Sequence, residues 1–291
     1  MGLKAKFNLV MLAAFVLGLA LAAALSYSIV QDNARREVLQ NAAIMIEAAS
    51  AIRDYTEKEV APLLDDQSKV RFLPQTIPFW AAKVNFHTLQ QNMPDYAYKE
   101  AALNPTNPAD RATDWETDVI DSFRQHPDMT ELVSERTTPT GRTLNLARPF
   151  RLTDKDCLTC HSVPSAAPAS MTDLYGTANG FGWKLGDVIG AQIVSVPMRV
   201  ALDKANRTFL VFLGGLALVF LVMIVLLNIL LHYFIVKPVR TISRVAGEVS
   251  LGNMDVPEYE VKGRDEIASL AASFNRMRRS LANAMKMLES S

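Results

Sequence analysis

Cysteine is almost missing from this chain of 291 residues, because only two are present. A protein with so few thiols has no second pair from which to build a disulfide framework, so a hydrophobic core must stabilise any folded domain. An excess of positive charge is missing too, since 30 basic side chains balance 30 acidic ones. This balance provides no basic face for nucleic acid, and we find no glycine-rich phosphate-binding loop. Nucleic-acid binding and nucleotide hydrolysis are therefore not expected.

Both cysteines fall within the segment Cys157-Leu158-Thr159-Cys160-His161. The spacing C-x-x-C-H is typical of the attachment of a c-type haem. Each thiol can form a thioether with a vinyl group of the porphyrin, and the adjacent imidazole can then bind the iron as proximal ligand. We therefore predict one covalent haem c per chain, with Cys157 and Cys160 as attachment points and His161 as an iron ligand.

Two other interpretations of these residues are a zinc site and a redox-active dithiol. Structural zinc requires four protein ligands, and the isolated residues His87 and His126 do not complete such a set. A redox dithiol is expected to open a helix after a buried strand, whereas polar residues precede Cys157 and a Pro/Ala/Ser-rich loop follows His161. With four histidines in the chain, we find no acid–base pair for catalysis and expect no enzyme.

Two uncharged apolar runs, Leu9 to Val30 and Phe209 to Leu231, are each long enough to cross a hydrocarbon core of ~30 Å as a helix. Basic residues before the first run and after the second predict that both ends are cytoplasmic, although Arg207 and the pair Arg35-Arg36 oppose this. Covalent attachment of haem c outside the cytoplasm agrees with that orientation. The small residues that end the first run also fit a cleaved signal peptide, but its length favours an uncleaved anchor.

These features predict a membrane protein with five segments. They are a cytoplasmic N-terminus (1–8), a first span (9–30), a periplasmic haem domain (31–205), a second span (209–231) and a cytoplasmic domain (232–291).

The exported segment is expected to have an α+β fold. Apolar residues spaced by three and four predict a helix from Gln31 to about Leu64, continuous with the first span. A second helix is expected after Asp114, which we predict to be its N-cap. The strings "TGRTLNLARPF" and "GDVIGAQIVSVPM" predict two strands. The elements between residues 65 and 113 cannot be assigned from the pattern.

Several strings in this segment resemble the bacterial c-haem PAS-like sensor family, long catalogued as a domain of unknown function. They are "IRDYTEKEVAPLL", "YKEAALNPTNPADRATDWE", "LARPF", "CLTCHSVPSAAPASM" and "GFGWKLGDVIGAQIVSVPM". The resemblance covers most of residues 31 to 200. It implies a PAS-type fold, a covalent haem on Cys157 and Cys160, and His161 as one axial ligand. Members of this family are commonly anchored in the membrane and joined to signalling modules.

The resemblance also implies that the N-terminal helix lies against the haem, which makes Met45 our first candidate for the sixth iron ligand. Met45 belongs to the apolar stripe of that helix as well, where methionine commonly serves a core or a dimer seam. An open or water-bound iron stays an alternative, as do the other possible side chains: His87, His126, Met93, Met129, Met171 and Met198. Arg53 and Arg111 are candidate partners of the haem propionates, because guanidinium matches a carboxylate in bidentate geometry. Weaker candidates are Tyr55 and Arg148, whereas Trp115 and Trp183 are expected to be packing residues.

The segment after the second apolar run has its own pattern. It opens with Lys237-Pro238-Val239, continues through "LGNMDVPEYEVKGRDE", and ends in a helix with alternating three- and four-residue spacing. That apolar seam consists of Ile267, Leu270, Phe274, Met277, Leu281, Ala284 and Leu288. Such a seam requires other helices to cover it. The segment resembles the HAMP linker of transmembrane receptors, which implies a parallel four-helix bundle formed by two chains, and therefore a homodimer.

These patterns predict a transmembrane signal transducer that senses redox state or a diatomic gas through its haem and signals through HAMP. The alternative is a membrane-anchored monohaem c-type cytochrome that transfers electrons. Because the sequence ends at Ser291, directly after the seam, we expect a cytoplasmic output protein to act in trans.

Overall fold

The computed structural model describes residues 2–68, 70–139, 141–260 and 263–289, and the chain divides into two compact units. The sheet unit comprises Tyr27–Thr208, and the helical unit comprises Met1–Ser26 together with Phe209–Ser291. Two long helices, α1 (Leu3–Tyr55) and α8 (Arg199–Leu230), contribute residues to both units.

The sheet unit contains one four-stranded antiparallel sheet with the strand order β1-β4-β3-β2. Its strands are β1 (Ala97–Ala102), β2 (Leu132–Thr138), β3 (Gly141–Arg151) and β4 (Val188–Pro197). The helical elements after α1 are the π-helix η1 (Thr56–Val60), α2 (Ala61–Leu63), α3 (Asp65–Ser68), η2 (Pro74–Thr76), α4 (Pro78–Asn92), η3 (Pro108–Asp110), α5 (Asp114–Gln125), α6 (Cys157–His161) and α7 (Ala169–Tyr175). This confirms the mixed composition of helices and strands that the sequence predicted.

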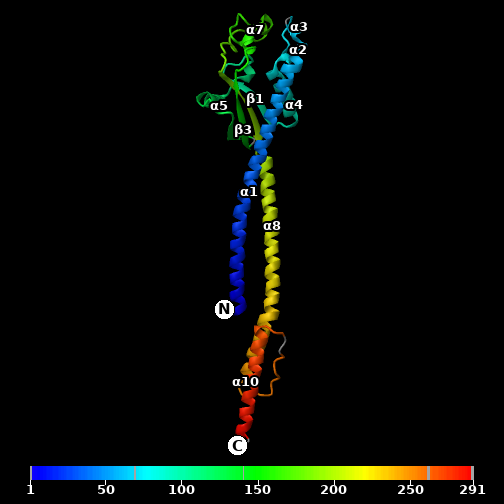
Figure 1. The fold of residues 1–291 in the computed structure, drawn as a ribbon, viewed down its shortest axis with the longest axis vertical. Helices are drawn as coiled ribbons and strands as arrows, with labels where there is room; N and C mark the ends of the chain where they lie inside the picture. Colours follow the sequence, from blue (N-terminus) through cyan, green and yellow to red (C-terminus); the bar gives the residue numbers. More distant parts are fainter. Residues whose placement is uncertain (1, 69, 140, 261–262, 290–291) are drawn as a thin grey trace. The chain divides into compact units, whose positions relative to one another are not determined.

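Each face of the sheet carries its own hydrophobic core, because successive side chains along a strand point to opposite faces. Leu146 and Val194 belong to the core that also contains residues of α1 and α4. Ala147 and Ile193, one residue along each strand, belong to the core built around Phe123 of α5. Figure 1 shows α1 and α4 on one side of the sheet and α5 on the other. The sheet therefore has helices on both faces.

The predicted helix from Gln31 to Leu64 is confirmed, since α1, η1 and α2 follow one another without a break to Leu63. Its predicted stripe is buried at Val38, Ala42, Met45 and Ala49. The two predicted strands are confirmed as β3 and β4.

The predicted N-cap of α5 was wrong by one residue. Thr113, not Asp114, precedes the helix, and its backbone N–H donates a hydrogen bond of 2.8 Å to the Glu116 carboxylate. Threonine followed by glutamate three residues later forms a capping box, which explains the shift of the boundary.

The helical unit shares α1 and α8 with the sheet unit, and these two helices belong to runs that are long and apolar enough to cross a membrane. The runs are Lys4–Leu63 and Arg199–Ser250, whose most apolar stretches have mean hydropathies of 2.5 and 3.1. Within this unit, the rings of Phe15 on α1 and Phe220 on α8 stack with centroids 5.0 Å apart.

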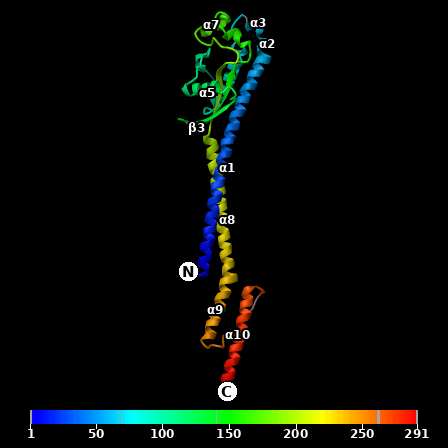
Figure 2. The ribbon, with the colours of Figure 1, turned by 60° about the vertical axis from the view of Figure 1, so that its left-hand side comes forward.

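After α8, the chain continues with the π-helix η4 (Leu231–Val236), α9 (Lys237–Ser250) and α10 (Glu266–Glu289). Figure 2 shows α9 and α10 side by side, and a small hydrophobic core joins them. The predicted seam of α10 divides between two directions. Ile267 and Phe274 pack toward α9, whereas Leu270, Met277 and Leu281 are exposed. The side chain of Leu288, which was predicted to continue the seam, lies outside the described residues.

Candidate haem-attachment site

The C-x-x-C-H residues lie beyond one end of the sheet. β1 ends at Ala102 and β3 near Phe150, and both residues pair with Gly190 close to the start of β4. The loops that follow β1 and β3, and the loop that precedes β4, therefore all lie at the same end of the sheet. These three loops contain residues 103–107, 152–161 and 176–187.

The motif itself forms the short helix α6, in which Cys157 is the first residue and His161 the last. Residues three and four apart share one face of a helix, so both thiols and the imidazole project from the same side of α6. Both thiols are free and half-buried. This is an arrangement from which one planar cofactor could be held at three points.

Cys157 is the first residue of a helix that follows strand β3. The argument that the motif does not begin a helix after a strand, which we used against a redox dithiol, was therefore wrong. A different observation weighs against that interpretation. Burial raises the pKa of both thiols, and for Cys157 the charges of Asp154, Glu57 and Asp156 raise it further. Reactive dithiols require a lowered thiol pKa. Within the described part of the chain, no group of three or more His, Cys, Asp or Glu residues is arranged to hold a metal ion.

The His161 ring is fixed by its surroundings. Its Nδ1 lies 2.7 Å from the carbonyl oxygen of Gly180, and because a carbonyl only accepts, Nδ1–H is the donor. The Nε2 atom is then the one left to bind a metal. Trp183 stacks on the ring at 4.0 Å between centroids, so this predicted packing residue packs directly against the histidine. Desolvation lowers the pKa of His161, which favours the neutral imidazole that a metal requires.

Asn104 bonds to the backbone on both sides of the carbonyl that accepts this hydrogen bond. Its side-chain oxygen accepts from Gly180 N–H at 3.1 Å, and its side-chain nitrogen donates to the Phe181 carbonyl at 3.2 Å. Gly180 has φ +82°, and a Cβ there would lie 2.2 Å from Thr106 Oγ1. Only glycine lets the two loops approach this closely. Sequence reasoning missed Asn104, Thr106 and Gly180 as functional residues.

The three arginines proposed as propionate partners differ in their surroundings. Arg53 places its guanidinium 4.1 Å from the centre of the Phe79 ring, and its buried Nε has no hydrogen-bond partner among the described residues. Arg111 donates to the Asn179 side chain at 3.1 Å, next to Gly180. Arg148 is paired with Glu47 of α1 at 2.7 Å. An orphaned donor therefore remains on Arg53.

The candidates for a sixth ligand are scattered. Met45 is enclosed in the core between α1, α4 and the sheet, whereas Met171 of α7 is buried in the loop region that also contains α6. His87 and His126 are exposed, and Nδ1 of His126 lies 3.0 Å from the Ser122 carbonyl oxygen. Ligation by Met45 stays a prediction.

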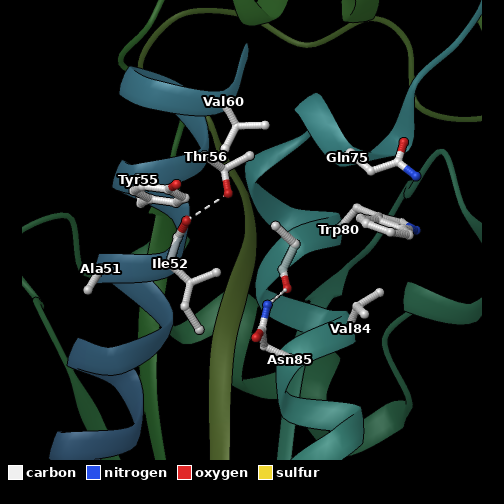
Figure 3. A pocket seen from close by; sticks show the side chains of 10 residues that line it. Ala51, Ile52, Tyr55, Thr56, Val60, Gln75, Trp80, Val84 and Asn85 are labelled. Carbon is white, nitrogen blue, oxygen red and sulfur yellow. Dashed lines mark hydrogen bonds between the residues drawn. The ribbon is translucent and has the colours of Figure 1, made fainter. Parts of the chain in front are cut away.

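A cavity of about 480 Å³ lies between the end of α1 and the start of α4. Figure 3 shows its lining: Ala51, Ile52, Tyr55, Thr56, Val60, Gln75, Trp80, Ala81, Val84 and Asn85. Thr56 belongs to the π-helix η1 and donates through its hydroxyl to the Ile52 carbonyl at 2.8 Å. π-Helical turns are frequent at functional sites. Glu57 follows Thr56 in the same π-helix, and its charge contributes to the raised pKa of Cys157. The helical segment at the end of α1 therefore lies near the attachment helix α6.

Comparison with known proteins gives two family matches. Residues 31–197 match the family model Tll0287-like, and residues 230–283 match the HAMP domain. A solved structure of the cyanobacterial haem protein Tll0287 is 17% identical, covers 55% of this chain and 95% of its own, and superposes with a TM-score of 0.44. A comparison with curated proteins gave no significant match.

Proposed function

Because this chain belongs to the Tll0287-like family and carries a HAMP domain, we propose that it is a membrane-bound signal transducer that senses through a covalent haem c. The observation that carries the proposal is the state of His161. Its Nδ1 is engaged by the Gly180 carbonyl, and two free thiols share its side of α6. When bound, haem would supply an iron centre that changes charge on one-electron reduction and can bind a diatomic gas.

In this proposal each residue of the site has one task. Cys157 and Cys160 form the thioethers, and Nε2 of His161 binds the iron. Arg53 offers its orphaned Nε–H to a propionate, since a buried donor without a partner is costly to the folded protein. Arg111 is a second propionate candidate, and Met45 remains our candidate for the sixth ligand.

We further propose that the sheet unit is a periplasmic PAS-like domain and that the HAMP segment is cytoplasmic, in a bacterial inner membrane. The two long apolar helices flank the sheet unit in sequence. Lys4 and Lys6 precede the first, and Lys237, Arg240 and Arg244 follow the second. Basic residues concentrate on the cytoplasmic side of membrane spans, which supports this orientation.

A short route leads from the sheet to the second span. β4 ends at Pro197 and α8 begins at Arg199, and the intervening Met198 donates its N–H to the Arg142 carbonyl at 2.9 Å. At the start of α8, Lys204 pairs with Glu37 of α1 at 3.1 Å. A change in how the haem loops pack against β4 would therefore reach α8 directly. It could bias two arrangements of the downstream helices if haem chemistry favours one of them.

We propose that the exposed residues of the α10 seam are covered by a second copy of the chain. Leu270 and Met277 are 49% and 62% exposed although they continue the apolar spacing of the helix. A parallel homodimer would bury them, as expected for heptad spacing. The signal would then pass from the paired HAMP helices to a cytoplasmic output protein.

Haem attachment is tested on the purified full-length protein by haem staining of the denatured band. Wild type should stain, and the double variant Cys157→Ser/Cys160→Ser should not. His161→Ala should keep the stain but change the visible absorption spectrum, because the thioethers remain while an axial ligand is lost. An unstained wild-type band would disprove the proposal.

Signalling is tested by cysteine cross-linking in membranes under oxidised, reduced and CO-treated conditions. Met277→Cys should cross-link between copies, with a yield that depends on the treatment. Arg276→Cys, exposed one residue away and off the seam, is the matched control. Identical Met277→Cys yields under all three treatments would argue for simple electron transfer instead.

A further inference from the structure

A partly buried carboxyl group, that of Glu100, lies in the middle of β1. Glu100 pairs with Gln192 of β4 and lies two residues from Tyr98, on the sheet face that α1 and α4 cover. The Tyr98 hydroxyl donates a hydrogen bond to the Glu100 carboxylate. The buried amide nitrogen of Gln192 has no partner among the described residues. An acidic group is thus placed on an otherwise largely apolar face.

Charged groups from three further elements surround Glu100. Arg53 approaches from α1 and Lys83 from α4, while Asp110 of η3 forms an ion pair with Lys83. Loss of hydration raises the pKa of Glu100 to about 8, with a smaller contribution in the same direction from Asp110. Arg53, the Tyr98 hydrogen bond and Lys83 oppose that rise. Glu100 is consequently a group that exchanges a proton near pH 8.

Arg53 connects this carboxyl group with the haem-attachment site. Arg53 and Glu57 are four residues apart on α1 and η1, and therefore lie one above the other on the same helical face. The charge of Glu57 acts on Cys157, and the charge of Arg53 acts on Glu100. One face at the end of α1 thus borders both the attachment helix and the buried carboxyl group.

The chain itself provides a second connection. Asn104 follows Glu100 by four residues, a distance of at most about 14 Å along an extended backbone. Asn104 holds the Gly180 peptide, whose carbonyl oxygen accepts from His161. Glu100 therefore lies on the strand that leads directly into a loop of the haem site, and a change of charge at that site would alter the affinity of Glu100 for a proton.

We propose that Glu100 is a redox-linked proton acceptor, which binds one proton from solvent when the attached haem gains one electron. The electron comes from a one-electron donor. Above about pH 8, where Glu100 is ionised before reduction, the carboxylate becomes a neutral carboxylic acid and the net charge of the region is unchanged. This inference rests on the proposed function, because it requires a bound haem. It adds that the sensor responds to pH and to electron supply together.

The test is the midpoint potential of the haem in the full-length protein, measured in a mediated optical titration from pH 6 to pH 10. The wild-type potential should be constant below about pH 8 and should fall as the pH rises above it. In Glu100→Gln this fall should be lost, whereas Glu47→Gln, which alters an exposed carboxylate on α1, should keep it. A redox-difference infrared spectrum should show a protonated carboxyl band in wild type that Glu100→Gln lacks.

Tyr98→Phe keeps the proposal testable if Glu100→Gln does not fold. Removing the hydroxyl that stabilises the ionised carboxylate should move the fall in potential to higher pH. A haem-loaded wild type with a potential independent of pH would overturn this inference and leave the proposed function intact. A pH dependence unchanged in Glu100→Gln would overturn it as well. Wild-type protein without haem would overturn both proposals.

Discussion

Substituting Gly180 by alanine tests the closest contact of the candidate site. The φ angle of +82° requires the left-handed region, which costs an alanine about 1–2 kcal/mol. The new Cβ would also lie 2.2 Å from Thr106 Oγ1 and 2.9 Å from Thr106 Cα. Because a backbone atom cannot rotate away, the loop must move. The hydrogen bonds of Gly180 with Asn104 and His161, and that of Phe181 with Asn104, would then break.

Gly182 provides a matched control in the same loop. Its φ is +79°, and a Cβ there would meet nothing within 4 Å. Gly182→Ala should therefore cost only the left-handed penalty. Gly180→Ala should lose about 2–4 kcal/mol more, from three hydrogen bonds at about 1 kcal/mol each and some residual strain. It should also shift the visible absorption spectrum, because His161 loses the acceptor for its Nδ1–H.

The measurement is urea unfolding of the detergent-solubilised holoprotein, followed by haem absorption and extrapolated linearly to water. Equal losses of stability in the two variants, with identical spectra, would refute the close approach of the two loops and the role assigned to Gly180.

Four shorter predictions concern other parts of the chain. Phe123→Ala should cost about 3–5 kcal/mol in the same urea assay, because this side chain of α5 is fully buried against the sheet, and a loss below about 1 kcal/mol would contradict that packing. Glu100 has a raised pKa in the folded state, so its contribution to the free energy of unfolding is complete below about pH 4.5 and is lost as the pH rises through about 8. Over this range the urea midpoint of wild type should fall relative to that of Glu100→Gln. Asn275→Ala should release the HAMP connector, because the Asn275 side chain makes bonds of 2.8 and 3.3 Å to the backbone of Tyr259, and limited proteolysis of the connector should accelerate. Met45→Leu keeps the packing and removes the thioether, so an unchanged reduced absorption spectrum would exclude Met45 as a ligand.

Local periodicity explains why some elements could be predicted and others not. The apolar stripe of α1 and the strands β3 and β4 contain many buried positions, so their apolar residues recur in the sequence with the spacing of a helix or a strand. β1 and β2 are the two edge strands of the sheet, and β1 carries Lys99 and Glu100 in its centre. Edge strands tolerate charged residues, so their alternation is weak in the sequence.

The candidate site divides in the same way. Cys157, Cys160 and His161 lie within five residues, and the chemistry of their spacing can be recognised without a structure. Asn104 acts on the Gly180 peptide across 76 residues, and nothing in either local sequence specifies the other. Asn104 and Gly180 come into contact because β1 and β3 both pair with β4, which places the two loops at the same end of the sheet. Candidate ligands for such a site can therefore be proposed from the motif alone, whereas the residues that position them can be found only from the fold.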